Sequence, residues 1–233
     1  HILNRQSVTS INRKQSVRPD WFSYQKCFDS ITSGLHDHRN TDMLVFLDNG
    51  TEKEHHTRLE KASCYFDVLK IQAGSDGKSQ MEMINYALNA NGKSDSSNWP
   101  DDDIIFFIED DYLFRPKWDV ILREGIEKNP NGFVNLYDHP DKYQVYPGLQ
   151  SQIVLSEHSH WRTTPSTCST YACRLVTLKK AIEIVEKHTS AGYGGYDHGM
   201  FTELGQNNYP LITPIPAFST HCENNYLSPL IDW

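Results

Sequence analysis

The sequence has no long hydrophobic run and no surplus of basic residues. No apolar segment approaches the roughly 18 residues needed to cross a bilayer, so no membrane span is predicted. The 22 lysine and arginine residues are outnumbered by 30 aspartate and glutamate residues, and the formal net charge is -8. Phosphate backbones are bound through clustered lysine and arginine, and no such cluster is present. The composition therefore argues against a membrane-spanning protein and against a nucleic-acid partner.

Cysteine is sparse, and its spacing matches no common motif. The five cysteines are odd in number and widely scattered: Cys27, Cys64, Cys168, Cys173 and Cys222. Their spacing fits neither a zinc ribbon nor a C-x-x-C redox motif, so free and mostly buried thiols are expected. The single glycosylation sequon, at 49–51, lies in a predicted ligand loop, where a glycan would obstruct binding. Both observations predict a reducing, cytoplasmic compartment.

The stretch from Ile104 to Tyr112 is the feature around which the sequence is organised. Five bulky apolar residues, 104–108, run directly into the carboxylates of Glu109, Asp110 and Asp111. An apolar run of this length, without polar alternation, is typical of a parallel strand that is covered on both faces. Ligands of such sheets bind at the carboxyl ends of the strands. The three acids are therefore expected at a ligand-binding edge.

Adjacent carboxylates at such an edge require positive charge nearby, because they repel one another and resist burial. Side chains alternate along a strand, so Glu109 and Asp111 are expected on one side and Asp110 on the other. Oxygen donors in this arrangement suit Mg²⁺ or Mn²⁺ holding a phosphate-bearing ligand. An acidic turn that caps a helix beginning at Pro116 is the alternative. These residues alone leave both interpretations open.

Strand and helix patterns alternate through the first half of the 233 residues. Strands are predicted at 1–4, 43–47, 66–71 and 104–108, each followed by a helical pattern, the last of them at 116–128. Such alternation indicates a parallel, doubly wound α/β sheet. Further strands are expected at 133–137 and 151–155, and a β-rich segment at 167–177 leads into a helix. A chain of this length is expected to form a single domain.

A glycine-containing turn at 74–78 precedes a predicted helix. Such a turn can receive phosphate at the helix N-terminus, and Lys78 adds positive charge. The spacing is not that of a Walker loop. This segment alone favours the alternative, a plain connection with a solvent-exposed lysine.

Four short motifs occur in a fixed order along the chain. They are Asp48 after a strand, the Glu109-Asp110-Asp111 cluster, a Gly-Gly-x-Asp loop ending at Asp197, and Ser219-Thr220-His221. With these motifs in this order, the chain resembles the nucleotide-sugar glycosyltransferases of the GT-A fold over nearly its whole length. The resemblance implies a mostly parallel, doubly wound nucleotide-sugar-binding half (1–115), continuous with a smaller mixed-sheet acceptor half (116–233).

The resemblance also implies roles for residues on the donor side. Asp48 would contact the nucleotide base, with Arg5 beside it. Glu109 and Asp110 match the start of the family's D-x-D element, with Glu where the first Asp usually stands. Its last acid, Asp111, would bind Mn²⁺ or Mg²⁺ on the diphosphate.

Two further roles come from the later motifs. His221 matches a metal-binding histidine that many members supply from the C-terminal segment, although a lone histidine is more often a surface or core residue. Asp197 matches the acceptor-side acid and would act as general base, which implies transfer with inversion. Most aromatic residues are expected to pack in the core. Trp161, Tyr193 and Tyr196 are predicted to contact the acceptor, since they occupy polar or glycine-rich loops.

The expected function is metal-dependent transfer of a sugar from a nucleotide sugar to a carbohydrate acceptor in glycan biosynthesis. The resemblance implies a UDP-sugar as the donor, because UDP-sugars are the usual donors in this family. A sugar nucleotidyltransferase is the nearest alternative, but it usually carries a basic glycine-rich signature after the first strand, and residues 7–10 show none. A glycoside hydrolase would use paired carboxylates without a metal cluster. A non-catalytic carbohydrate-binding domain is the alternative from a different class.

Overall fold

The computed structural model describes residues 1–6, 18–48, 66–89, 99–189 and 196–233. The strands are β1 (Ile2–Gln6), β2 (Met43–Asp48), β3 (Asp67–Ile71), β4 (Ile104–Glu109), β5 (Tyr112–Phe114), β6 (Phe133–Val134), β7 (Ile153–Leu155), β8 (His160–Thr163), β9 (Tyr171–Arg174), β10 (Leu211–Ile215) and β11 (Ser219–His221). The helices are α2 (Tyr24–Ser33), η1 (His38–Asn40), α4 (Asp76–Leu88), α5 (Trp118–Lys128), α6 (Asp141–Gln144), α7 (Leu175–Thr189) and α8 (Tyr196–Gln206). Among them, no helix is long and apolar enough to cross a membrane.

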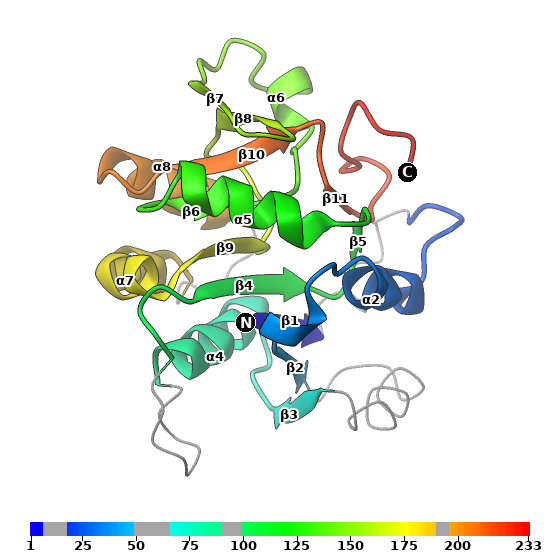
Figure 1. Cartoon of the computed structure of the whole chain (residues 1–233), viewed down its shortest axis with the longest axis vertical. Helices are drawn as coiled ribbons and strands as arrows, with labels where there is room; N and C mark the ends of the chain where they lie inside the picture. The colour runs from blue at the N-terminus through cyan, green and yellow to red at the C-terminus, as the bar shows by residue number, and fades with distance from the viewer. Residues whose placement is uncertain (7–17, 49–65, 90–98, 190–195) are drawn as a thin grey trace.

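One continuous sheet, with the strand order β3-β2-β1-β4-β9-β6-β10-β8-β7, runs through the molecule (Figure 1). Strands β3, β2, β1 and β4 are mutually parallel. Beyond them, β9 is antiparallel to β4 and β6, β10 is parallel to β6, and β8 is antiparallel to both β10 and β7. The predicted α/β class is confirmed, with a parallel half that continues into a mixed half.

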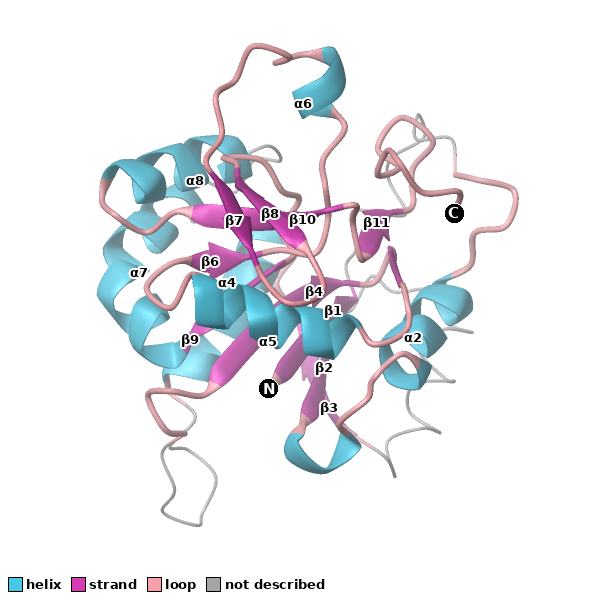
Figure 2. Cartoon of the chain, turned by 45° about the horizontal axis from the view of Figure 1, so that its top comes forward, coloured by secondary structure: helices cyan, strands magenta, loops and turns pink. Residues whose placement is uncertain are grey.

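Strand β4 shows why an unbroken apolar run forms a buried strand. Ile105 and Phe107 pack in one apolar cluster with residues of α4, α7 and α8, whereas Phe106 and Ile108 pack in a second cluster with residues of α5. In Figure 2, α5 lies in front of the sheet and α4 behind it. All four side chains are buried, and each such burial stabilises the fold by about 1.5–3 kcal/mol. Helices on both faces therefore hold β4 in place, with its acidic end at the edge of the sheet.

Several element boundaries differ from the prediction for local reasons. The helical pattern expected after the first strand forms α2, which begins at Tyr24 because the Ser23 side chain accepts a hydrogen bond from the Lys26 amide at 3.1 Å and caps the helix. The strand expected at 133–137 ends at Val134, since the Leu136 carbonyl instead accepts hydrogen bonds from the amides of residues 218 and 219. The helical pattern expected after the second strand and the sequon at 49–51 lie outside the described residues.

A small second sheet, which the sequence did not predict, joins β5 and β11. The strands are antiparallel, and His221 pairs with Tyr112. Since Tyr112 directly follows Asp111, this register brings the C-terminal segment to the acidic end of β4.

Candidate active site

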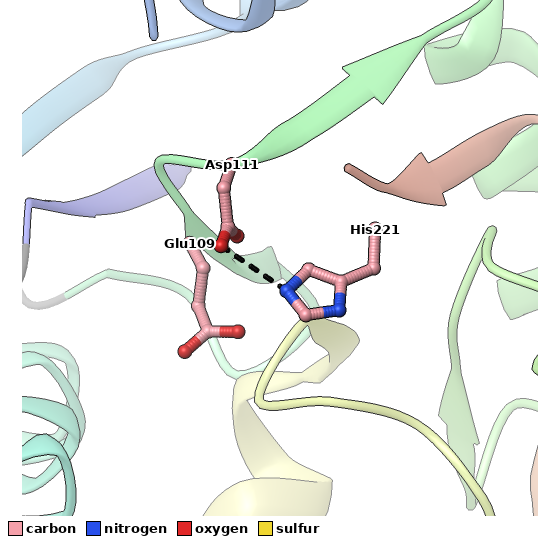
Figure 3. Close-up of side chains that lie close together, drawn as sticks. All are labelled: Glu109, Asp111 and His221. Carbon is pink, nitrogen blue, oxygen red and sulfur yellow. Dashed lines mark hydrogen bonds and ion pairs between the residues drawn. The ribbon is translucent and has the colours of Figure 1, made fainter. Parts of the chain in front are cut away.

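Three side chains from the ends of β4 and β11 gather at the carboxyl edge of the parallel strands. Ligand atoms of Glu109, Asp111 and His221 all lie within 4.8 Å of one another (Figure 3). The His221 Nε2 atom is 3.1 Å from Asp111 Oδ2. Asp110, between the two acids, is buried outside this group. One imidazole and two carboxylates make a donor set that suits Mn²⁺ or Mg²⁺.

Asp111 has the features expected of a metal ligand. Its Oδ1 atom is buried and has no hydrogen-bond partner among the described residues. Its Oδ2 atom accepts a hydrogen bond from Arg18 Nη2 at 2.9 Å, in addition to the contact with His221. Burial alone would raise the pKa of Asp111. The charges and hydrogen bonds of His221 and Arg18 have the larger effect and hold this pKa well below the ordinary value. A buried and ionised carboxylate with one free oxygen fits a bound cation.

Arg18 is a site residue that the sequence analysis did not single out. Besides Asp111, its Nη1 atom donates to the Cys222 carbonyl at 2.8 Å and lies 3.8 Å from Glu223 Oε1. Its guanidinium also lies over the Phe22 ring, 4.7 Å from the centroid. The only signal in the sequence was the general requirement for positive charge among the acids. Nothing in the spacing connects Arg18 to Asp111, 93 residues away.

Arg5 and Glu109 form a partly buried ion pair between β1 and β4. The two residues are register partners across the parallel strands, and Arg5 is fully buried. The guanidinium contacts Glu109 Oε1 and also donates to the Asp76 carbonyl at 2.5 Å. Burial raises the pKa of Glu109 to about 7, because its effect is larger than the opposing effect of the positive charge of Arg5. Arg5 thus lies beside the acids rather than in solvent.

The other predicted donor-side residues lie on neighbouring elements. Asp48 is buried at the end of β2, where its Oδ1 atom accepts a hydrogen bond from the Ala73 amide at 3.3 Å. Lys78 is exposed in the first turn of α4, where its backbone amide donates to Ser75 Oγ. For Asp110, burial and the adjacent acids Asp111 and Glu109 raise the pKa well above its usual value.

Asp197 lies buried in the first turn of α8. Its Oδ2 atom accepts a hydrogen bond from the Ser169 amide at 3.2 Å, whereas its Oδ1 atom is buried without a partner in the described part of the chain. Burial raises the pKa of Asp197 well above the ordinary value, and the charges of Cys168 and Glu109 add to this shift. A carboxylate in this environment is a stronger proton acceptor than one in water.

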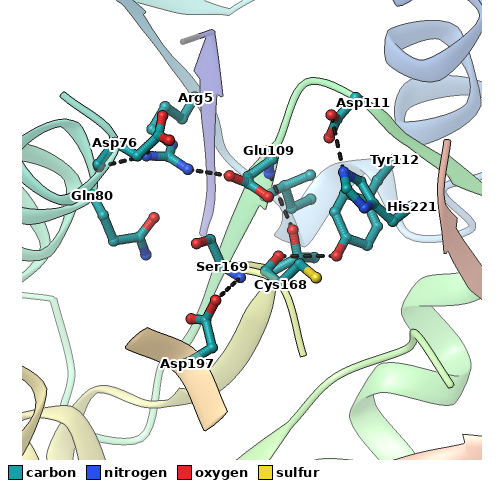
Figure 4. A network of polar contacts seen from close by, with 12 residues as sticks. Arg5, Asp76, Gln80, Glu109, Asp111, Tyr112, Cys168, Ser169, Asp197 and His221 are labelled. Atoms are coloured by element: carbon teal, nitrogen blue, oxygen red, sulfur yellow. Dashed lines mark hydrogen bonds and ion pairs between the residues drawn. The ribbon is translucent and has the colours of Figure 1, made fainter. Parts of the chain in front are cut away.

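The segment from Cys168 to Thr170 connects Asp197 with the end of β4 (Figure 4). The Cys168 carbonyl accepts a hydrogen bond from Tyr112 Oη at 2.9 Å, and Thr170 Oγ1 accepts one from the Glu109 amide at 3.2 Å. Ser169, whose amide holds Asp197, has φ of 45°, in the left-handed region that non-glycine residues rarely adopt. Such strained residues persist where surrounding contacts hold them, often at functional sites.

Cys168 is the second site residue that the sequence analysis did not assign. Burial raises the pKa of its thiol, but hydrogen bonds with His139 and His221 lower it to about 6. His139 is in turn 3.0 Å from Asp141 Oδ1. These contacts join the loop after β6 to β11 and to the segment before β9, and no local sequence pattern links the three.

The predicted acceptor residues have different outcomes. Tyr196 is half-buried at the start of α8, and its hydroxyl is 3.0 Å from Ser169 Oγ, beside Asp197. Tyr193 lies outside the described residues. The expectation that Trp161 occupies a polar loop is wrong, because it lies in β8 with its side chain fully buried in the core. Its indole packs where a sugar cannot reach, and Nε1 donates to Ser156 Oγ at 2.9 Å.

Comparisons with known proteins identify the fold but no close relative. No family model matches the chain, and no curated protein is significantly similar to it in sequence. Similar solved structures include residues 1–349 of S. aureus TarS (TM-score 0.50) and the same region in complex with UDP (TM-score 0.53). In both, identity is 11%, and the match covers 91% of this chain and 56% of that chain. A CMP:2-keto-3-deoxy-manno-octonic acid synthetase with bound CTP matches at TM-score 0.49 and 12% identity, covering 91% of this chain and 87% of that one.

TarS is a glycosyltransferase, and the synthetase is a nucleotidyltransferase. The chain spans about half the length of the TarS structures that it matches. At these identities the similarity establishes architecture alone. The chain has a GT-A-like fold.

Proposed function

We propose that this chain is a metal-dependent glycosyltransferase that moves a sugar from a UDP-sugar to a carbohydrate acceptor. The observation that carries the proposal is the grouping of Glu109, Asp111 and His221 within 4.8 Å at the carboxyl edge of a GT-A-like sheet. UDP is the proposed nucleotide because the TarS region with the same architecture was solved with UDP. We also propose that the transferred sugar is a hexose, and that residues 1–115 bind the nucleotide sugar and residues 116–233 the acceptor.

On the donor side, Asp111 and His221 would hold Mn²⁺ or Mg²⁺, with Glu109 beside them. A bound cation would stabilise the negative charge that develops on the departing diphosphate. Asp48, at the end of the neighbouring strand β2, would contact the base. Arg5 is paired with Glu109, so its role is to fix that carboxylate, and through it the position of the nucleotide sugar. Asp110 and Lys78 are also proposed to contact the nucleotide sugar.

On the acceptor side, Asp197 would accept the proton of the attacking hydroxyl. Its raised pKa favours this role, because a general base works best when its pKa approaches the working pH. A single base and an in-line displacement give inversion at the anomeric carbon. Tyr196, next in sequence and close to Ser169, is the proposed acceptor contact among the described residues.

A turnover assay tests the proposal against its alternatives. The purified chain would be incubated with UDP-glucose, UDP-galactose and their N-acetylamino forms, with and without a glycan mixture, and UDP release measured. We expect UDP release that requires Mn²⁺ or Mg²⁺, stops on addition of EDTA and increases with acceptor. Pyrophosphate release from a nucleoside triphosphate and a sugar phosphate would instead establish a nucleotidyltransferase. Sugar release from glycans without nucleotide would establish a hydrolase, and glycan binding without turnover a binding domain.

A further inference from the structure

Two cysteines distant in sequence have adjacent sulfur atoms. Cys27 Sγ and Cys222 Sγ are 3.6 Å apart, although the residues are separated by 195 positions. Both side chains are fully buried. The pair is adjacent to the proposed metal site, since Cys222 directly follows His221 and its carbonyl accepts a hydrogen bond from Arg18.

Contacts on both sides fix this proximity. Cys27 lies in the first turn of α2, and this helix is joined to β5 by a hydrogen bond of 3.0 Å from the Phe114 amide to Ser30 Oγ. On the other side, the Cys222 amide donates to the Asp111 carbonyl at 2.9 Å, directly after β11 pairs with β5. Because β5 contacts both partners, the two thiols are held together by the fold.

Two thiols at this separation permit two outcomes. They can remain reduced, with one thiol donating a weak hydrogen bond to the other sulfur. They can also form a disulfide, for which the sulfur atoms must approach to about 2.05 Å. Disulfide formation therefore requires the two sulfur atoms to move about 1.5 Å closer than their present 3.6 Å. Among the described cysteines, Cys173 is buried in β9, within the apolar cluster that includes residues of α4, α7 and α8, and it takes no part in the contact between Cys27 and Cys222, which makes it a suitable control.

We propose that Cys27 and Cys222 are a site of reversible disulfide formation that ties α2 to the segment carrying His221. With hydrogen peroxide as the oxidant, one thiol is oxidised to a sulfenic acid and one water is released. The sulfur of the other cysteine then attacks the sulfenic sulfur, the S–S bond forms and a second water leaves. The net reaction consumes two thiols and one peroxide and yields one disulfide and two waters. A dithiol reductant restores both thiols by exchange.

The bond has a structural consequence at the edge of the sheet. It would covalently join α2 to the residue that follows His221, across a segment of chain that spans most of the protein. A cross-link that closes so long a loop restricts the unfolded chain and raises stability. Because both thiols are buried, the reaction proceeds only during local opening and is expected to be slow.

Peptide mapping of the peroxide-treated full chain tests the proposal. After treatment, free thiols would be alkylated and the protein digested without reductant. We expect a linked peptide pair that contains Cys27 and Cys222, lighter by two hydrogens than the separate peptides and lost after dithiothreitol. The pair should form in Cys173→Ala and be absent from Cys27→Ala and Cys222→Ala. Since the wild-type chain carries the main result, poor folding of a variant does not remove the test.

Thermal unfolding provides the second measurement. The oxidised wild-type chain and Cys173→Ala should melt roughly 5 °C or more above their reduced forms, whereas Cys27→Ala should show no such increase. Absence of the linked peptide, or its replacement by pairs that involve other cysteines, would overturn the proposal. A linked protein with an unchanged or lower melting temperature would overturn the claim that the bond ties the two segments. Neither readout involves nucleotide, sugar or metal, so both are independent of the proposed transferase activity.

Discussion

Asp111 is the residue at which the opposing charges of the site meet. Arg18 and His221 share its Oδ2 atom, while Oδ1 is buried and unpaired in the described part of the chain. A bound divalent cation would add positive charge beside Asp111, and Glu109 would supply further negative charge. The positive charge of Arg18 lies close enough to oppose the cation, because charges a few ångströms apart interact by several kcal/mol at the effective dielectric of a protein.

Replacing Arg18 should therefore strengthen metal binding in the absence of nucleotide. We expect Arg18→Gln to raise the affinity for Mn²⁺ by roughly tenfold, measured by calorimetric titration with the metal alone. Lys179→Gln is a matched control, because Lys179 pairs with Asp101 on an exposed surface. Weaker Mn²⁺ binding in Arg18→Gln would show that the arginine supports the site instead of competing with the cation.

Asp197 provides the second test at the scale of single residues. If it is the general base, Asp197→Asn should lower kcat by about 10²–10⁴ and leave UDP affinity unchanged, because the carboxylate acts on the acceptor proton. The measurement is steady-state UDP release together with direct UDP binding. Near-native kcat in the variant would contradict the assignment.

The pH dependence of transfer follows from the raised pKa of Asp197. The base works in its ionised form, so activity should be retained above the raised pKa and lost as the pH falls through it. We expect the acid limb of the kcat profile at a higher pH than the ordinary aspartate value of 3.8. The residual activity of Asp197→Asn should lack this limb. A limb that persists unchanged in that variant would belong to another group.

At the scale of elements, α5 packs closely on the mixed half of the sheet. It contributes Trp118, Ile121, Leu122 and Ile126 to the cluster that also contains Trp161. Gly125 permits this approach, since a Cβ atom there would meet Trp161 at 2.5 Å and Val134 Cγ1 at 2.8 Å. The contact also explains why Trp161 cannot contact an acceptor sugar, because α5 packs against its ring.

Two glycine substitutions should have opposite effects on stability. Gly125→Ala should lower the free energy of unfolding by roughly 1–3 kcal/mol through overpacking against Trp161. Gly205→Ala, in α8 with nothing within 4 Å of the added Cβ, should raise it by up to about 1 kcal/mol through helix propensity. Denaturant unfolding of both variants measures the difference. A neutral or stabilising Gly125→Ala would contradict the close packing of α5.

At the scale of the whole molecule, local patterns predicted the parallel half of the fold and strands β6, β7 and β9 of the mixed half, but not β8, β10 or the second sheet. The runs at β2 and β4 are long, apolar and buried on both faces, so periodicity identified them. Strands β5 and β11 have only three residues each, and their pairing depends on contacts more than 100 positions apart. Local patterns carry no signal for such pairing.

The same distinction applies to the site. Glu109 and Asp111 share a strand end, so alternation predicted their common side. His221 was placed by the order of motifs in the resemblance, since no spacing relates it to Asp111. The contacts of Arg18 and Cys168 form only when distant segments meet. The prediction that Trp161 lies in a loop was wrong because its sequence neighbours are polar, although the residue belongs to a strand with one buried face.

Calorimetric titration with UDP, with and without Mn²⁺, tests the central claim most directly. We expect the wild-type chain to bind UDP in the presence of Mn²⁺, and Asp111→Asn to lose at least roughly tenfold in that affinity, the loss expected when a metal ligand is removed. Asp102→Asn, a matched change at a side chain that is 88% exposed, should bind as the wild type does. Equal UDP binding with and without Mn²⁺, undiminished binding in Asp111→Asn, or no UDP binding at all would contradict the account.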